Sequence, residues 1–541
     1  MADGLLNKAS IILTPTGYKA GTLYNVAPVV EPYEDFDFAR ASVASRVNSS
    51  GLVEMVGRTL SSELMPSVAT IVNLLGGSIT QISSNSYSST SDGTTGSSLR
   101  PKFDFNTTSG KTYKLVITPT GAITGTLNFD FYDGSSYLFQ NYDFTTTKEI
   151  YFTDNGSVFG GFDGTKTYSI ASFTISVKEV IDTNNIPRIS YDSNGENGHI
   201  LLEPSSTNLL SYSEDFSEWY AGESVVVVNQ LTSPNGEITA DKLNAFNATN
   251  QQYVKLTPTV STGSACTLSC FAKKGEVNYI ALVGLNPFTT SFFDLNNGVL
   301  LGNTATSSSI EDFGNGWYRC TSTFDADTTS KYSAIYLSYN GTSISNGTNI
   351  SNGEGVYIWG AQLEQLPYAT SYIPTLTGST VTRATETANG AGSADLINST
   401  EGVLYVEAKV NSETDFSVST LSISDGTDNN RISILLYRSS DVIRSSMNYN
   451  GSTQFDFNLS GYSRNQYYKI AILFQQNNCK IFINGSQIGS TDTSATMPSA
   501  NTFNQLNLNL ANGLYPFYGE VKALAVFNEA LSDDELNNLT G

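Results

Sequence analysis

Apolar and polar residues alternate with a period of two over most of the chain, which predicts strands rather than helices. Tyr113–Thr118 and Tyr168–Val177 show the pattern of half-buried strands clearly. Turn dipeptides such as Asp133-Gly134 and Asn155-Gly156 follow such segments at short intervals. Strands at this spacing are typical of two-sheet sandwiches. The pattern therefore predicts an all-β chain of tandem jelly-roll or β-sandwich domains.

Changes in composition along the chain predict three sandwich domains joined by polar segments. The lead segment has no core of its own, so we expect it to become ordered only against a partner or sister chains. The expected parts are a lead segment at 1–61, an inserted jelly roll at 62–180, a linker at 181–205, a jelly roll at 206–375, a linker at 376–396 and a C-terminal sandwich at 397–541.

Only two segments have helical signals, and one dipeptide marks a hairpin. A helix is expected within Glu63–Leu75, beginning near Pro66. A second helix is expected at the end of the chain, because Ser532 followed by Glu535 three residues later forms a capping box. Asn484-Gly485 predicts a type I′ hairpin turn, which requires two residues with positive φ.

Charge excludes several classes of partner for this 541-residue chain. Its 50 Asp and Glu outnumber 28 Lys and Arg, for a net charge of −22, whereas a binder of nucleic-acid phosphates needs a basic surface. The same balance disfavours an anionic membrane surface. No basic leader precedes an apolar run, and no 18 consecutive residues are apolar. We expect a soluble protein made in a cytoplasm, without nucleic acid and without membrane insertion.

Cysteine and histidine offer little chemistry. Cys266 and Cys270 could begin a metal knuckle, but no second pair follows, and residues four apart in a strand share a face, so two small buried side chains are the simpler interpretation. The one histidine, His199, lies in a turn-rich segment and is expected at the surface. A Ser-His-Asp device would have to use it. We predict no catalytic residue and no cofactor.

Paired carboxylates were considered for glycoside hydrolysis, which needs two of them about 5–10 Å apart. The nearest approaches are Glu413 with Asp415, at a turn, and Asp533 to Glu535, on the expected terminal helix. Neither pair has a flanking Trp. The chain is therefore predicted not to be an enzyme.

One loop gathers oxygen ligands of the kind that Ca²⁺ prefers. Asp425 and Asp428 lie with Asn429 and Asn430 in a single predicted turn. Turn formation alone also favours Asp, Asn and Gly at such positions. Calcium at Asp425 and Asp428 and a purely structural turn both remain open.

Three segments resemble bacteriophage virion proteins, in particular tail and head fibre proteins. They are Phe38–Glu54, then Ile186–Tyr191 with Leu201–Phe216, and Tyr357–Pro374, which is the most specific and is followed by Thr382-Arg383-Ala384. The resemblance implies a component of the virion. It also implies that the block between the first two segments is an insertion.

Two further resemblances concern the sandwiches. The end of the inserted block, Ser172–Val180, is similar to the last strand of carbohydrate-binding-module jelly rolls, and 206–375 is expected to be of the same kind. The C-terminal block resembles laminin-G-like, concanavalin A-type domains at 467–472, at Ile481–Gly485 and at 519–536. Such domains bind sugars, proteins or nothing, and no ligand residue can be transferred.

Together these observations suggest a non-enzymatic phage fibre or spike for host attachment, located in the virion. The expected partners are other virion proteins, through the lead segment, and host-surface carbohydrate. A homotrimer is expected, because linked copies of weak sites gain avidity. The alternatives are a purely structural capsid-decoration or tail-assembly protein and a tail-borne polysaccharide depolymerase.

Overall fold

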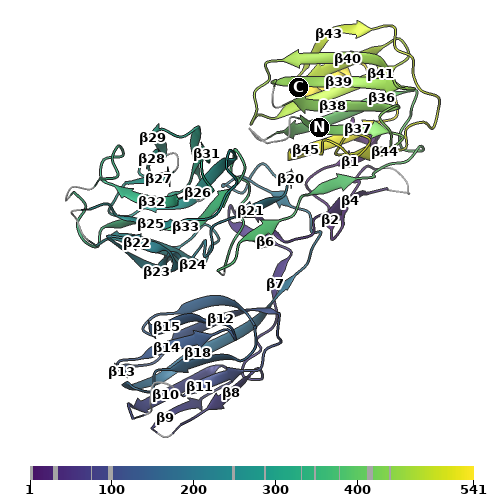
Figure 1. Cartoon of the computed structure of the whole chain (residues 1–541). Coiled ribbons are helices and arrows are strands. Elements are labelled where there is room, and N and C mark those ends of the chain that lie inside the picture. The colour runs from purple at the N-terminus through teal and green to yellow at the C-terminus, as the bar shows by residue number, and fades with distance from the viewer. Residues whose placement is uncertain are drawn as a thin grey trace. The chain divides into compact units, whose positions relative to one another are not determined.

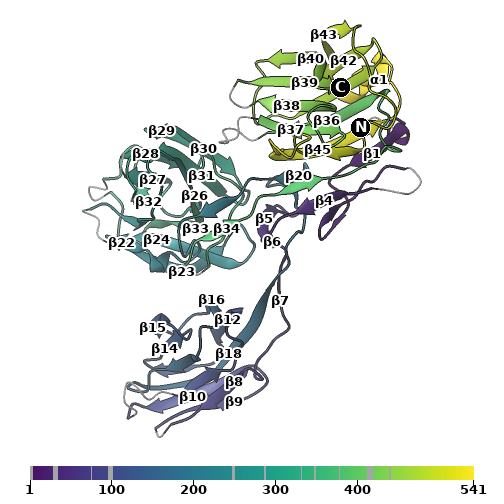
Figure 2. The same cartoon turned by 45° about the vertical axis from the view of Figure 1, so that its right-hand side comes forward.

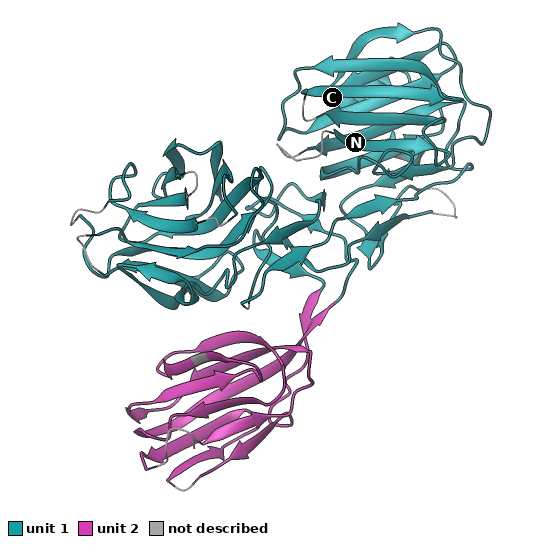
Figure 3. Cartoon of the chain, viewed as in Figure 1, with its two compact units in different colours: residues 1–57, 183–541 teal, residues 58–182 magenta. Residues whose placement is uncertain are grey.

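Nearly every regular element of the chain is a β-strand (Figure 1), which confirms the predicted all-β class. Two compact units form, one of residues 1–57 with 183–541 and one of residues 58–182 (Figure 3). Within the described residues, no helix combines the length and apolar character needed to cross a membrane. The computed structural model describes residues 4–28, 34–74, 76–94, 101–246, 250–285, 288–329, 332–345, 349–376, 378–410, 418–437 and 440–541.

Residues 58–182 form a sandwich of two antiparallel sheets around an aromatic core. Phe103, Phe129 and Phe173 are fully buried there, and contacts between ring edges and faces add to the stabilisation from burial. One sheet has the order β16-β12-β18-β10-β9, with β7 and β13 also on β18, and the other has the order β15-β14-β17-β11-β8. The strands are β7 (Arg58–Leu60), β8 (Ala69–Val72), β9 (Gly77–Gln81), β10 (Ser86–Asp92), β11 (Lys102–Phe105), β12 (Thr112–Pro119), β13 (Ile123–Gly125), β14 (Asn128–Tyr132), β15 (Tyr137–Asp143), β16 (Lys148–Thr153), β17 (Val158–Phe162) and β18 (Thr167–Asp182).

The helix expected within Glu63–Leu75 is wrong over its described part, 63–74. Strand β8 occupies much of it and pairs with β11. Thr70, Ile71 and Val72 are β-branched, and such side chains favour a sheet once a partner strand is available. Pairing across the sheet therefore overrides the local helical signal.

A second sandwich, formed mainly by residues 220–364, has two six-stranded sheets. Their orders are β22-β25-β32-β27-β28-β29 and β23-β24-β33-β26-β31-β30, and apolar side chains such as Leu268 and Ile335 fill the space between them. The strands are β22 (Tyr220–Gly222), β23 (Ser224–Thr232), β24 (Ile238–Ala245), β25 (Tyr253–Leu256), β26 (Ala265–Lys274), β27 (Tyr279–Leu285), β28 (Thr289–Asp294), β29 (Val299–Asn303), β30 (Ser307–Asp312), β31 (Trp317–Asp325), β32 (Tyr332–Ser338) and β33 (Gly355–Glu364), preceded by the 3-10 helix η2 (Phe216–Glu218).

The C-terminal sandwich packs an eight-stranded sheet on a five-stranded one. The orders are β19-β20-β45-β36-β41-β42-β43, with β1 also on β45, and β40-β39-β38-β37-β44. The elements are η1 (Leu6–Lys8), β1 (Ala9–Leu13), β19 (Ile189–Ser190), β20 (His199–Leu202), β36 (Glu401–Lys409), β37 (Val418–Ser424), β38 (Arg431–Tyr437), β39 (Val442–Tyr449), β40 (Ser452–Ser460), β41 (Tyr468–Gln475), β42 (Cys479–Ile483), β43 (Ser486–Asp492), β44 (Gln505–Asn507), β45 (Gly519–Phe527) and α1 (Asp533–Thr540).

Two local predictions in this sandwich are confirmed. Asn484 and Gly485 have φ values of 47° and 79° and join β42 to β43. Ser532 caps α1, and the Glu535 side chain accepts a hydrogen bond from the Ser532 backbone N–H, which completes the capping box. Both signals depend on neighbouring residues alone, which explains why the sequence reveals them.

The lead segment is not a separate arm, and the expectation that it lacks a core within this chain is wrong. Strand β1 pairs antiparallel with β45, with Leu13 opposite Leu524, and Figure 2 shows it in the C-terminal sandwich. All five residues of β1 are buried. Ile11 and Leu13 contact the core between the sheets, whereas Ile12 contacts the opposite cluster. Consecutive apolar residues require cover on both faces, and this sheet supplies it.

The two expected linkers are also part of the fold, which corrects their description as connectors. From 181–205, β20 pairs with β45. From 376–396, β34 (Val381–Arg383) pairs with β21 (Ser206–Asn208), and β35 (Thr387–Asn389) pairs with β4. The remaining strands of the lead segment are β2 (Tyr18–Lys19), β3 (Thr22–Leu23), β4 (Phe36–Ala39), β5 (Ala44–Val47) and β6 (Val53–Val56).

Excision of residues 58–182 should leave the larger unit folded. The Thr183 backbone N–H donates to the Gly57 carbonyl oxygen over 2.6 Å, so the chain leaves and re-enters this unit at adjacent points. A short replacement therefore closes the gap at little entropic cost. We expect a chain with Gly-Ser in place of 58–182 to keep its cooperative unfolding, measured by tryptophan fluorescence, since all three Trp residues lie outside the excised part. Loss of the cooperative transition would contradict the division into units.

Candidate functional site

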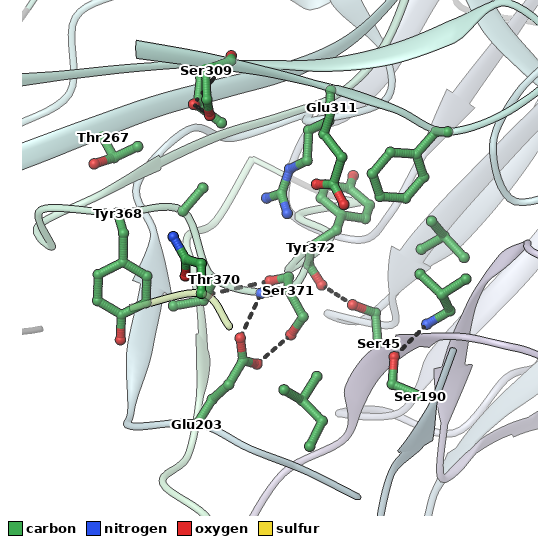
Figure 4. Close-up of a pocket in the computed structure, with 18 of the residues that line it drawn as sticks. Ser45, Ser190, Glu203, Thr267, Ser309, Glu311, Tyr368, Thr370, Ser371 and Tyr372 are labelled. Carbon is green, nitrogen blue, oxygen red and sulfur yellow. Dashed lines mark hydrogen bonds between the residues drawn. The ribbon is translucent and has the colours of Figure 1, made fainter. Parts of the chain in front are cut away.

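A cavity of about 610 Å³ lies in the larger unit, on the outer side of the sheet that contains β26, β31 and β30. The segment that follows β33 and the β5–β6 hairpin complete its walls. In Figure 4, Ser309 and Glu311 lie above Thr370 and Ser371. The volume falls within the roughly 300–1,000 Å³ of small-molecule sites.

Strand alternation places hydroxyl groups on this outer side. Leu268 and Phe324 point into the core of the sandwich, whereas Thr267 and Thr323, one position away, line the cavity. The Thr267 and Thr323 hydroxyl oxygens are 2.8 Å apart. Those of Ser309 and Thr321 are 2.6 Å apart. The hydroxyl-bearing residues of β30 and β31 in the lining are Ser307, Ser308, Ser309, Thr321 and Thr323.

Arg319, on β31, is a buried cation in this lining. Its exposed fraction is 8%, its Nη2 donates to the Ser269 hydroxyl over 3.2 Å, and its Nε has no hydrogen-bond partner. Its guanidinium carbon lies 5.4 Å from the centre of the Phe271 ring. Within the described chain, no carboxylate oxygen lies within 4 Å of it. Burial lowers the pKa of Arg319, an effect that more distant Glu side chains oppose, and an arginine remains charged regardless.

Glu311 faces Arg319 across the strand pair without closing on it. The two residues are directly opposite each other in the β30–β31 register. Glu311 is exposed and lines the same cavity (Figure 4). Desolvation by the surrounding protein raises the pKa of Glu311, while Arg319 opposes the rise. The cavity therefore presents one positive and one negative group that do not neutralise each other by direct contact.

Beside the cavity lies a buried charge cluster, formed by Arg40, Arg188, Glu203, Arg383 and Glu386. Glu386 accepts from Arg40 Nη1 over 2.6 Å and from Arg188 Nε over 2.9 Å. Arg188 and Arg383 each lie 2.9 Å from a Glu203 oxygen. The members come from the lead segment and from both expected linkers, so ion pairs connect these segments.

Glu203 connects the cluster to the cavity. Its two carboxylate oxygens accept from the backbone N–H and the hydroxyl of Ser371, over 2.8 and 2.6 Å (Figure 4). Burial alone would raise the pKa of Glu203, but Arg383 and Arg188 outweigh it and lower the pKa to about 2. Glu203 is therefore ionised at neutral pH, and its charge is balanced within the cluster.

A second surface of interest, the tyrosine face, comprises Tyr220, Tyr253, Lys255, Tyr332 and Tyr336. The Tyr253 and Tyr336 rings stack at 4.6 Å, and the Tyr332 and Tyr336 hydroxyl oxygens are 2.6 Å apart. Lys255 Nζ lies 4.7 Å from the centres of the Tyr220 and Tyr332 rings. Tyr220 is 61% exposed, so its ring is open to stacking.

The predicted calcium ligands lie in one turn, with their oxygens already hydrogen-bonded. Asp425 accepts from the Thr427 N–H over 2.9 Å and from the Asn430 side chain over 2.7 Å. Asp428 accepts from Asn512 over 2.5 Å and lies 3.7 Å from an Arg431 nitrogen. No group of three or more His, Cys, Asp or Glu suited to a metal occurs among the residues described. Calcium binding at this turn stays a prediction.

Cysteine follows the simpler interpretation, whereas histidine does not. All four cysteines are free and buried, and burial raises the pKa of Cys270 to about 12. The expected surface position of His199 is wrong, because its exposed fraction is 7% and its strand pairs with β45. Its Nε2 lies 3.6 Å from a Glu520 oxygen. Burial lowers the pKa of His199 below its usual value.

The carboxylates considered for hydrolysis do not form a described pair. Glu413 and Asp415 lie outside the described residues. Asp533 contacts Lys480 over 2.6 Å, and Glu535 caps α1 and contacts Lys8 over 2.9 Å. Sequence reasoning missed Arg319, although its place between outward-facing positions of an alternating strand was a usable signal.

Among solved structures, three similar ones illustrate the range of matches. The Ruminococcus gnavus IT-sialidase CBM40 bound to alpha2,3 sialyllactose is 19% identical over 28% of this chain and 94% of its own, with a TM-score of 0.24. Domain 4 of AbnA, a GH43 extracellular arabinanase from Geobacillus stearothermophilus, in complex with arabinotriose, is 14% identical over 29% and 73%, at 0.24. Domains LG4-5 of the mouse laminin alpha1 chain are 10% identical over 61% and 92%, at 0.18.

A family model identifies the fold of the C-terminal sandwich. The model of the concanavalin A-like lectin/glucanases superfamily matches residues 395–537. No curated protein matches the chain. The sandwich of strands β36 to β45 occupies the matched region. The C-terminal domain is therefore laminin-G-like and of the concanavalin A type, as the sequence predicts.

Proposed function

We propose that this protein is a bacteriophage fibre or spike component that binds host-surface glycan without cleaving it. The observation that carries glycan binding is the cavity beside β30 and β31, which combines about 610 Å³ of space with a row of hydroxyls and the Phe271 ring. Sugars present hydroxyls at their edges and apolar C–H groups on their faces, so polar groups and rings together suit them. The virion role rests on the resemblance of 38–54, 186–216 and 357–374 to phage proteins.

The tyrosine face supports the same proposal by a second route. Its partly exposed rings offer stacking surfaces, and its hydroxyls offer hydrogen bonds. Single contacts of this kind are weak, so adhesion would depend on several linked copies. We propose a homotrimer, located in the virion and attached to other virion proteins.

Binding without cleavage is proposed because the acidic groups around the cavity have other partners. Glu203 belongs to the buried charge cluster, and Glu520 contacts Lys409 over 2.7 Å. Glu311 remains as a single exposed carboxylate, whereas hydrolysis requires two acting together.

Blocking the cavity should abolish glycan recognition. Ser309 is exposed on the edge strand β30, so Ser309→Trp should fill the cavity without disturbing the core. We expect the wild-type protein to bind host cells and a subset of an array of glycans. Ser309→Trp should bind about tenfold more weakly or worse. Ser452→Trp, on the edge strand β40, is the matched control and should bind like wild type.

Three outcomes would point elsewhere. Absence of binding to cells and glycans would favour a purely structural virion protein. Release of oligosaccharides from the bound glycan would indicate a depolymerase. A monomeric mass in sedimentation equilibrium would overturn the trimer.

A further inference from the structure

Arg319 differs from the other buried arginines near the cavity in having no anionic partner. Arg40, Arg188 and Arg383 each lie within 3 Å of a carboxylate oxygen. Arg319 is buried to a similar degree, yet its protein contacts are the Ser269 hydroxyl and the face of Phe271. Its Nε lacks a hydrogen-bond partner.

An unpaired buried charge is costly, so this arrangement is best explained by a group that enters from the cavity. A guanidinium presents parallel N–H donors that match the two oxygens of a carboxylate. Arg319 lines the cavity, and Phe271 beneath the guanidinium carries no charge that would compete for it. A carboxylate is therefore a well-matched partner.

The surroundings of Arg319 restrict what the carboxylate belongs to. Hydroxyls of Ser309, Thr321 and Thr323 extend along the neighbouring positions and suit a polyhydroxylated ring. Glu311, opposite Arg319, would repel a second negative group. The site thus favours one acidic sugar in an otherwise neutral stretch of glycan and disfavours densely charged polyanions.

We propose that the cavity binds a carboxylate-bearing sugar residue, with its carboxylate on Arg319 and its ring hydroxyls on the β30–β31 hydroxyl row. This inference rests on the proposed glycan-binding function and names the class of sugar that the cavity takes.

Titration calorimetry on the purified full chain tests it. The probes are methyl glycosides of glucuronate, galacturonate and N-acetylneuraminate, with methyl glucoside, methyl galactoside and acetate as comparisons. We expect at least one acidic glycoside to bind about tenfold or more tightly than its neutral counterpart and than acetate. Arg319→Gln should remove that difference. Arg444→Gln, which removes an exposed arginine paired with Asp456, should keep it.

Glu311→Gln gives an independent result at an exposed position, where a folding defect is not expected. It should tighten the acidic glycosides about threefold or more and leave the neutral ones unchanged, because a repelling charge is removed. Equal binding of acidic and neutral glycosides, binding of acetate as tight as that of the sugar, an Arg319→Gln protein that binds like wild type, or an unaltered affinity in Glu311→Gln would each overturn the inference. Neutral glycans bound in this cavity would leave the proposed function intact while this inference failed.

Discussion

Replacing Glu386 with glutamine should lower the free energy of unfolding of the larger unit by about 3–5 kcal/mol, the usual effect of breaking a buried ion pair. Glu386 is fully buried and accepts from Arg40, Arg188 and the Glu203 backbone N–H. The neutral amide would leave Arg40 without a carboxylate and Arg188 with only Glu203. The desolvation of two guanidinium groups would then be poorly compensated.

Urea titration followed by tryptophan fluorescence measures this loss, because Trp219, Trp317 and Trp359 all lie in the larger unit. Asp456→Asn, which breaks the exposed pair with Arg444, is the control and should change stability by about 1 kcal/mol or less. A Glu386→Gln protein as stable as the control would show that the cluster does not hold the unit together.

Truncating Leu13 to alanine should destabilise the C-terminal sandwich by about 2–5 kcal/mol, and removing residues 1–28 should cost more than about 5 kcal/mol. Leu13 is fully buried between the sheets, and Ile11 and Ile12 in the same strand are buried as well. The truncated chain would also leave the edge of β45 without β1.

Hydrogen exchange of the amides in 519–527 measures the effect where β1 is lost. We expect exchange in β45 to accelerate strongly in Leu13→Ala and in the truncated chain. Val26→Ala alters a side chain that is 41% exposed in the same segment and should leave exchange unchanged. Native exchange rates in the truncated chain would restore the view of the lead segment as a separable arm.

The sequence predicts what depends on neighbouring residues and fails where distant segments meet. Strand periodicity, the Asn484-Gly485 turn and the Ser532 cap are local, and the structure contains all three. The pairing of β1 with β45 joins residues more than 500 positions apart, and no local pattern encodes such a choice.

Buried polarity was the second source of error. Arg188 and Glu203 lie in a segment whose polar, turn-rich composition is typical of a solvent-exposed linker, yet both are buried because their charges meet in space. A single sequence does not show which charges become paired. Arg319 was missed for the opposite reason, since its significance lies in the partner it lacks.

The place of β1 determines how the molecule would carry a mechanical load. Residues 9 and 541 both belong to the C-terminal sandwich, so tension applied between them would act on that domain first. The other two sandwiches form a closed loop between β1 and β36 and would bear none of the force while the β1–β45 pairing lasts. Ala9 lies opposite Phe527 in an antiparallel pair, so the pull would open the hydrogen bonds one after another from that end, as a zipper opens. Lys8, which bonds to Glu535 of α1 over 2.9 Å, is the contact that such a force would meet first.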